Sequence, residues 1–169
     1  MNALEVIHTR RSIRQYQDKA VPEELVEKLL AAAMSAPSAR NAQPWQFVVV
    51  TDRTMLEDIS RINPNAAMAA HAPLGILICG DLRLELSAGY WVVDCAAAAQ
   101  NMLLAAHALG LGAVWTGIYP RQERMVGFHR LLNLPNEVHA HSLIVIGYPA
   151  EQPPRQDRYR HDRVHRNGW

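Results

Sequence analysis

The feature that most constrains the fold is the segment 89–109, which predicts a long helix that is apolar on nearly every side. Its run of four alanines, Ala96–Ala99, would let another helix approach closely, and Gly110 suits the left-handed position that ends a helix. A helix without a polar face must be covered all round. We expect the cover to come either from the rest of the chain or from a second copy of it, in the isologous contact of a homodimer.

The other hydrophobic patterns predict a single α+β domain over residues 1–169. Residues 73–80 are apolar throughout, which is typical of a strand buried on both faces. The helices fall unevenly between the strands, and this favours a mixed sheet over regular βαβ winding. Neither a repeat nor a linker interrupts the chain. The predicted strands are 45–51, 73–80, 113–116 and 139–147, and the predicted helices are 3–9, 22–36, 53–62, 65–72, 89–109 and 121–131. The second helix has an apolar stripe of Leu25, Leu29, Leu30 and Ala33.

Charge and cysteine content exclude several classes of protein. The net charge of +1 argues against a general nucleic-acid or anionic-membrane binder, which needs a broad positive field. No apolar run reaches the length of a membrane span, and we expect a cytoplasmic protein. Cys79 and Cys95 lie in apolar contexts without metal-ligand spacing, so that we expect two buried thiols and no metal site.

The segment Arg10–Arg14 places three guanidinium groups and one hydroxyl within five residues. If the backbone is extended here, Arg10, Ser12 and Arg14 lie on one side, and Arg11 and Ile13 on the other. Arginine forks are well suited to phosphate, so the pattern indicates a site for a phosphate monoester. Taken alone, the cluster is more typical of a solvated basic turn, because clusters of charge usually lie on the surface.

One further segment has the character of a ligand site. Residues 37–44 form a loop in which two prolines bracket small and amide side chains, and a predicted strand follows directly. A plain helix-to-strand connection is the alternative. The glycine-rich nucleotide motifs of Rossmann and P-loop proteins are absent from the sequence.

Four separated motifs together resemble the FMN-dependent nitroreductase family, in particular its short members. They are Arg10–Arg14, Pro37–Trp45, Gln100–Leu104 leading to Gly110–Gly112, and Trp115–Gly117. Residues 163–169 also resemble the end of short family members. The resemblance implies a mostly antiparallel mixed sheet flanked by helices, in an intertwined homodimer that holds FMN between its subunits. Residues 149–169 would then be an extension that docks on the dimer.

The resemblance also implies roles for individual residues. The phosphate would bind Arg10, Ser12 and Arg163, with Arg11 nearby and Arg14 at the pyrimidine edge of the flavin ring. The other subunit would contribute the loop residues Pro37, Ser38, Ala39 and Asn41. Gly117 would direct its backbone N–H at flavin N5, and Trp115 and Thr116 would line the same wall. No side chain is expected to act as a catalytic acid, base or nucleophile, because the flavin would carry the chemistry.

The activity implied is that of an FMN-dependent NAD(P)H oxidoreductase with a ping-pong mechanism, acting on a nitroaromatic, quinone-like or other small planar acceptor. Two alternatives stay open. One is a specialised enoate or azo reductase with a different electron donor, and the other is a non-catalytic FMN-binding or regulatory module. No sequence motif chooses between NADH and NADPH.

Three other residues are chemically notable. Asp94 lies in the apolar helix, and a buried carboxylate needs a hydrogen-bond partner. We expect it to take part in a structural network rather than in catalysis. His139 and His141 lie two residues apart on a predicted strand and would share a face, as surface or core residues.

Overall fold

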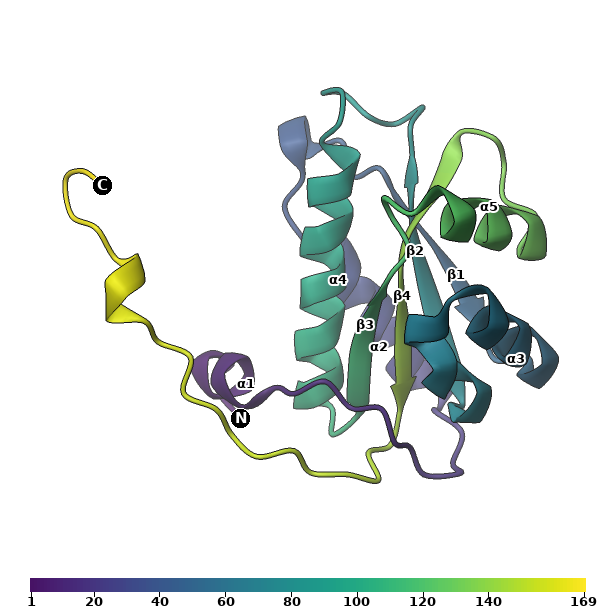
Figure 1. Ribbon diagram of the computed structural model, residues 1–169, viewed down its shortest axis with the longest axis horizontal. Helices are drawn as coiled ribbons and strands as arrows, with labels where there is room; N and C mark the ends of the chain where they lie inside the picture. The colour runs from purple at the N-terminus through teal and green to yellow at the C-terminus, as the bar shows by residue number, and fades with distance from the viewer.

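An antiparallel sheet of four strands forms the centre of the protein. The computed structural model describes residues 1–169, and Figure 1 shows the sheet with helices on both sides. The strands are β1 (Trp45–Val50), β2 (Leu74–Asp81), β3 (Gly112–Gly117) and β4 (Val138–Gly147). Their spatial order is β1-β2-β4-β3, and all three pairings are antiparallel. A single parallel bridge, Ser12 to Ala113, adds the N-terminal segment to the edge of β3. The predicted mixed, mostly antiparallel α+β fold is therefore confirmed.

The helices divide between the two faces of the sheet. The α-helices are α1 (Ala3–Thr9), α2 (Glu23–Met34), α3 (Arg53–Ile62), α4 (Trp91–Ala108) and α5 (Gln122–Leu131), and short 3-10 turns occupy Ala39–Asn41, Pro64–His71 and His161–Arg163. Side chains of α2 and α4 form one buried cluster with the sheet, whereas α3, α5 and the turn after α3 form the other. The helices predicted from the sequence are all present. None of them is both long and apolar enough to cross a membrane.

Strand β2 occupies the middle of the core, as its apolar sequence predicts. All eight of its residues are buried, because strands lie on both sides of it and helices on both faces. The buried stripe of α2 differs in part from the predicted one. Val26 is buried together with Leu29 and Ala33, while Leu25 and Leu30 are half-buried. Val26, Leu29 and Ala33 belong to the buried cluster that α2 forms with α4 and the sheet, and the two leucines pack against that cluster.

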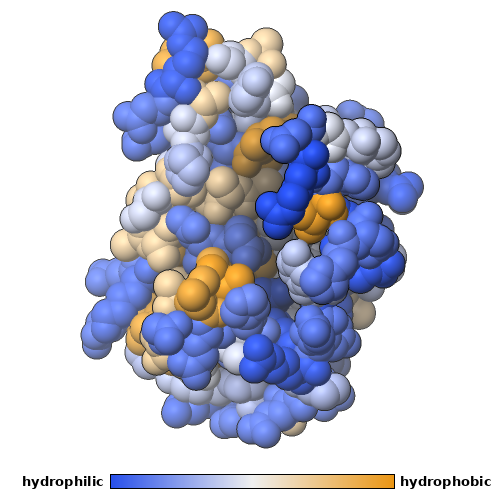
Figure 2. Space-filling view, turned by 90° about the vertical axis from the view of Figure 1, so that its left-hand side faces the viewer, coloured by the Kyte–Doolittle hydropathy of each residue, from blue (hydrophilic) through white to orange (hydrophobic).

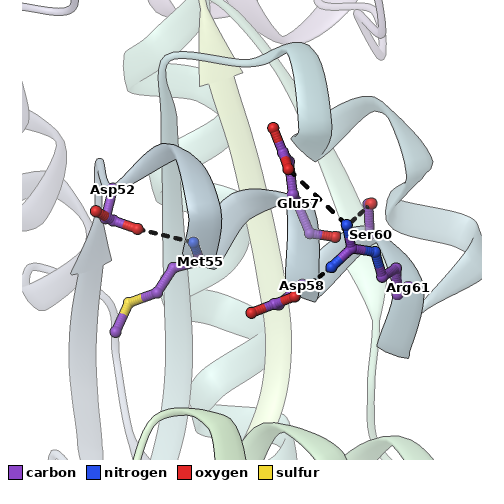
Figure 3. A network of polar contacts seen from close by, with 6 residues as sticks. All are labelled: Asp52, Met55, Glu57, Asp58, Ser60 and Arg61. Atoms are coloured by element: carbon purple, nitrogen blue, oxygen red, sulfur yellow. Dashed lines mark hydrogen bonds and ion pairs between the residues drawn. The ribbon is translucent and has the colours of Figure 1, made fainter.

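Helix α3 illustrates how local side-chain contacts set the ends of an element. The carboxylate of Asp52 accepts a hydrogen bond from the Met55 N–H at 2.8 Å and so caps the first turn (Figure 3). Near the other end, Arg61 forms ion pairs with Glu57 and Asp58, which lie one turn earlier. These pairs are solvent-exposed and contribute only a few tenths of a kcal/mol each, about 0.3–0.5.

Helix α4 is buried on one side and open on the other. Its inner side packs on the sheet, whereas Val93 on its outer side is 62% exposed. We call this open side the outer face of α4; it comprises Val93, Ala97, Gln100, Leu104 and Ala108. A groove of about 440 Å³, lined mostly by apolar residues, lies beside it between α1, α2 and α4. Figure 2 shows pale and orange apolar surface between blue regions on this side of the molecule. The chain alone therefore covers only part of the helix.

The last residues run first along the body and then away from it. Residues 148–154 lie beside residues 11–17, joined by hydrogen bonds from the Gln17 N–H to the Tyr148 oxygen and from the Ala150 N–H to the Gln15 oxygen, both 2.9 Å long. Residues 155–169, which we call the arm, first pass beside α1, where residues 155–159 line a cavity with it, and then extend away from the body (Figure 1). The hydrogen bonds of the arm are all internal, and Trp169 at its end is fully exposed.

Candidate active site

A basic cavity of about 750 Å³ lies where the N-terminal segment meets the beginning of the arm. Arg10 and Arg11 line it together with Arg155 and Arg158. Burial and the charges of Arg158 and Arg11 lower the pKa of Arg10, which means that its positive charge lacks a compensating anion. Asp157 is the only acidic residue of the lining. A phosphate bound here would relieve the repulsion among these guanidinium groups.

The N-terminal segment is extended along the outer edge of β3, so that its side chains alternate. The Ile13 N–H donates to the Ala113 oxygen at 3.1 Å, and the Ile13 side chain is buried. Arg11 and Ile13 line a second cavity of about 350 Å³, which Ser12 and Arg14 do not line. The separation of Arg11 and Ile13 from Ser12 and Arg14 agrees with the prediction, but Arg11 also shares the basic cavity with Arg10, which Ser12 and Arg14 do not line.

The guanidinium group of Arg11 binds backbone carbonyls. Its Nε donates to the Pro154 oxygen at 3.0 Å, and its Nη1 donates to the oxygens of His8 and Arg10 at 3.1 and 2.6 Å. Its Nη2 is buried without a partner. Arg163, by contrast, lies on the exposed arm and is not among the residues of the basic cavity. Within one chain, the structure therefore does not bring Arg163 to Arg10.

The loop 37–44 has an unusual backbone held by side chains. Arg40, Asn41 and Gln43 have φ of 54°, 56° and 49°, a region that residues other than glycine seldom occupy. Such strain is concentrated at ligand sites. The Gln43 N–H donates to Ser38 Oγ at 2.9 Å, which closes the loop on itself. Pro37 and Asn41 are exposed, whereas Ser38 and Ala39 are half-buried; none of these four lines the basic cavity of the same chain.

Asp94 connects this loop to the first turn of α4. Its Oδ1 accepts a hydrogen bond from the Ala39 N–H at 2.9 Å. The residue is 4% exposed, and its Oδ2 has no partner. The hydrogen-bond partner expected for this buried carboxylate is present, and it is a backbone group of the candidate ligand loop.

Gly117 ends β3 on the open edge of the sheet. The Ile118 N–H donates to the His141 oxygen at 3.2 Å, so the alternation of an antiparallel ladder directs the Gly117 N–H away from β4. The Gly117 oxygen accepts from Arg124 Nη1 at 2.8 Å and Asn63 Nδ2 at 3.3 Å, which fixes the orientation of the peptide. A Cβ added at Gly117 would meet no atom within 4 Å. A flat ring can therefore approach this backbone closely.

Sequence reasoning did not find Asn63 and Arg124. The full burial of Asn63 was not visible in the sequence, although an amide directly before Pro64 was a signal for a capping or bridging role. Arg124 lies on α5, and only the packing of α5 near the end of β3 brings its guanidinium to Gly117. Both residues act on a backbone oxygen, for which the sequence has no motif.

The two residues before Gly117 point into the protein rather than along its edge. The buried Thr116 hydroxyl donates to the Leu143 oxygen at 3.0 Å, and the half-buried Trp115 ring lies 5.6 Å from the ring of His141. Burial lowers the pKa of His141 to about 4, although a backbone hydrogen bond with Val92 opposes the shift. His141 Nδ1 lies 3.0 Å from Ser142 Oγ. His141 is thus a neutral core residue, and His139 is half-buried beside it.

Fold and site together define an α+β protein with a basic cavity beside an open strand edge. The sequence profile of the Nitroreductase family matches residues 7–71 and 60–148, which cover most of the chain. The chain belongs to the nitroreductase family, as its motifs predict.

Similar proteins of known sequence or structure span the whole chain. A provisionally named NADH dehydrogenase/NAD(P)H nitroreductase of Methanothermobacter thermautotrophicus is 53% identical over 100% of this chain and 88% of its own. A protein with the same provisional name from Parabacteroides distasonis has 40% sequence identity to this chain, and its crystal structure superposes with a TM-score of 0.96. The superposition covers 100% of both chains. At that score, residues 149–169 follow a similar course in both structures.

A third comparison includes a cofactor. The crystal structure of a provisionally named nitroreductase from Desulfovibrio desulfuricans, in complex with FMN, is 32% identical with a TM-score of 0.86. The similarity covers 100% of this chain and 98% of that one.

Proposed function

We propose that this chain is an FMN-dependent NAD(P)H oxidoreductase that works by a ping-pong mechanism. A reduced nicotinamide and then a nitroaromatic or quinone-like acceptor would occupy the same position in turn. The observation that carries the proposal is the outer edge of β3, where Ser12 lies beside Ala113 at one end and Gly117 presents its N–H at the other. Four residues of extended strand separate these ends by about 13 Å. A phosphate-bearing side chain and a flat ring can therefore be held by one strand edge.

The residues of the site are chemically suited to FMN. Arg10 and Ser12 would bind the phosphate, with Arg14 at the pyrimidine edge of the ring and the backbone of Trp115, Thr116 and Gly117 along its wall. The uncompensated charge of the basic cavity supports a dianionic ligand. When bound, FMN supplies the hydride chemistry at N5. The chain itself would hold the ring against the Gly117 N–H, and Asn63 and Arg124 fix the orientation of that peptide. Arg14 would favour negative charge on the ring.

A homodimer would complete this site. The loop residues Pro37, Ser38, Ala39 and Asn41 lie outside the basic cavity of their own chain, and we propose that they contact the flavin of the partner. The outer face of α4 supplies an apolar contact surface, and the arm extends beyond the body of its own chain. Arg163 would reach the phosphate once the arm is docked on the dimer. We further propose that residues 1–169 act as one domain and that the protein is cytoplasmic.

The test is the visible absorption spectrum of the freshly purified protein, recorded before and after anaerobic addition of NADH or NADPH. We expect a two-banded flavin spectrum that bleaches on addition. A flavin spectrum that persists with both nicotinamides would point to another donor or to a non-catalytic flavin-binding module. Absence of flavin even after addition of excess FMN would refute the proposed cofactor site.

A further inference from the structure

Arg11 occupies the point at which the arm leaves the body. Before this point, residues 148–151 are held to residues 14–17 by backbone hydrogen bonds and by the Glu151 carboxylate, which accepts from the N–H groups of Arg14 and Gln15. The bond from Arg11 Nε to the Pro154 oxygen is the last hydrogen bond between this strand of chain and the body. Everything beyond Pro154 is bonded only to itself.

The geometry of Arg11 fixes direction as well as position. One guanidinium group binds the Pro154 oxygen on one side and the His8 and Arg10 oxygens on the other. A planar fork that joins three carbonyls restrains the relative orientation of the two segments, which a point charge would not. The side chain lines the second cavity with Ile13 and also the basic cavity with Arg10, whereas Ser12 and Arg14 line neither. Its Nε and Nη1 donors are committed to backbone oxygens, and only Nη2 is buried without a partner.

We propose that Arg11 is a positioning residue that acts as the exit clamp of the arm and affects the FMN site through the arm. By fixing the position at which the arm begins, Arg11 places Arg155 and Arg158 beside Arg10 and directs the rest of the arm outward. This inference rests on the proposed function for its effect on FMN, but its structural part stands independently. It assigns to Arg11 a role different from that of Arg10, its neighbour in sequence.

The first test measures the direction of the arm without FMN. Nitroxide labels would be attached to Glu27→Cys on α2 and Val164→Cys on the arm, both of which are exposed, whereas the native cysteines are buried. Labelled chains diluted in unlabelled protein give the distance distribution within one chain by pulsed EPR. We expect Arg11→Met and Arg11→Lys to broaden or shift the distribution. Arg130→Met, at an exposed arginine on α5, should leave it unchanged. An unchanged distribution in both Arg11 variants would overturn the proposal.

The second test is a double-mutant cycle on FMN affinity in the full chain. Arg11→Met and Arg163→Ala should each weaken FMN binding about tenfold or more, and the double variant should be no weaker than Arg11→Met alone, because release of the arm already removes Arg163 from the phosphate. Arg11→Lys should behave as Arg11→Met. Additive losses, or full affinity in Arg11→Lys, would show that Arg11 acts directly on the phosphate and would refute the clamp. Failure of the unsubstituted chain to bind FMN would refute the proposed function and leave the distance measurement valid.

Discussion

Among single residues, Asp94 has the most specific structural task, since it holds the strained loop through the Ala39 N–H. We predict that Asp94→Ala lowers the free energy of unfolding by about 1–3 kcal/mol, because it leaves this donor without an acceptor. It should also weaken FMN binding. Asp94→Asn is the matched control, because its amide oxygen can still accept the bond. Urea unfolding and FMN titration of both variants test this, and equal losses in the two would contradict it.

His141 gives the fold a defined dependence on pH. Its pKa is lowered from 6.5 to about 4, so between these values the unfolded chain binds a proton that the folded chain does not. As the pH is lowered through this window, the free energy of unfolding should therefore fall by about 1.4 kcal/mol per pH unit. Above pH 6.5, His141 should contribute nothing to the slope. Urea unfolding from about pH 7 down to about pH 4 measures the slope. His141→Gln should lack this part of the slope; an identical slope in the variant would contradict the assignment.

In the edge strand β3, substitution by alanine should affect stability at one glycine and not at another. A Cβ at Gly112 would lie 2.6 Å from Ile13, whereas a Cβ at Gly117 would meet nothing within 4 Å. We predict that Gly112→Ala lowers the free energy of unfolding by about 1–3 kcal/mol through overpacking. Gly117→Ala should change it by less than about 0.5 kcal/mol.

For enzymatic activity we expect the reverse: the substitution at Gly117 should be harmful and the one at Gly112 should not. Gly117→Ala should lower turnover with NAD(P)H more than about tenfold, since a methyl group would hold the ring away from the backbone N–H. Gly112→Ala should keep near-normal turnover per folded molecule. Thermal or urea unfolding together with anaerobic flavin reduction checks both variants. Full turnover in Gly117→Ala would remove Gly117 from the site.

The elements themselves could be predicted from the sequence because each has a strong local signal. The uniform apolarity of β2 and the periodicity of α3 indicate their type and length directly. The order β1-β2-β4-β3 has no such signal, since it depends on how distant segments pair. The same limit applies to the site: the motif of Arg10 and Ser12 is local, whereas the carbonyl partners of Arg11 and the contact of Arg124 with Gly117 arise only from packing.

At the scale of the whole molecule, the outer face of α4 determines the state of association that we propose. Leu104→Glu would place a charge in the apolar contact, and we predict a monomer with much weaker FMN binding. Val126→Glu, at a position on α5 that is 44% exposed, should remain a dimer. Analytical ultracentrifugation of both variants measures whether each is a monomer or a dimer. A monomeric unsubstituted chain that still binds FMN tightly would contradict the shared site.

The position of β4 has a consequence for biosynthesis. This strand lies between β2 and β3, yet it is the last of the four to be translated. A ribosome releases the chain from its N-terminus, so β2 and β3 each wait with an unpaired edge until β4 emerges. Unpaired edges are the surfaces through which nascent chains aggregate. Protection by a chaperone is therefore most needed between the synthesis of β2 and that of β4, and a translational pause in that interval would be more harmful than one after residue 147.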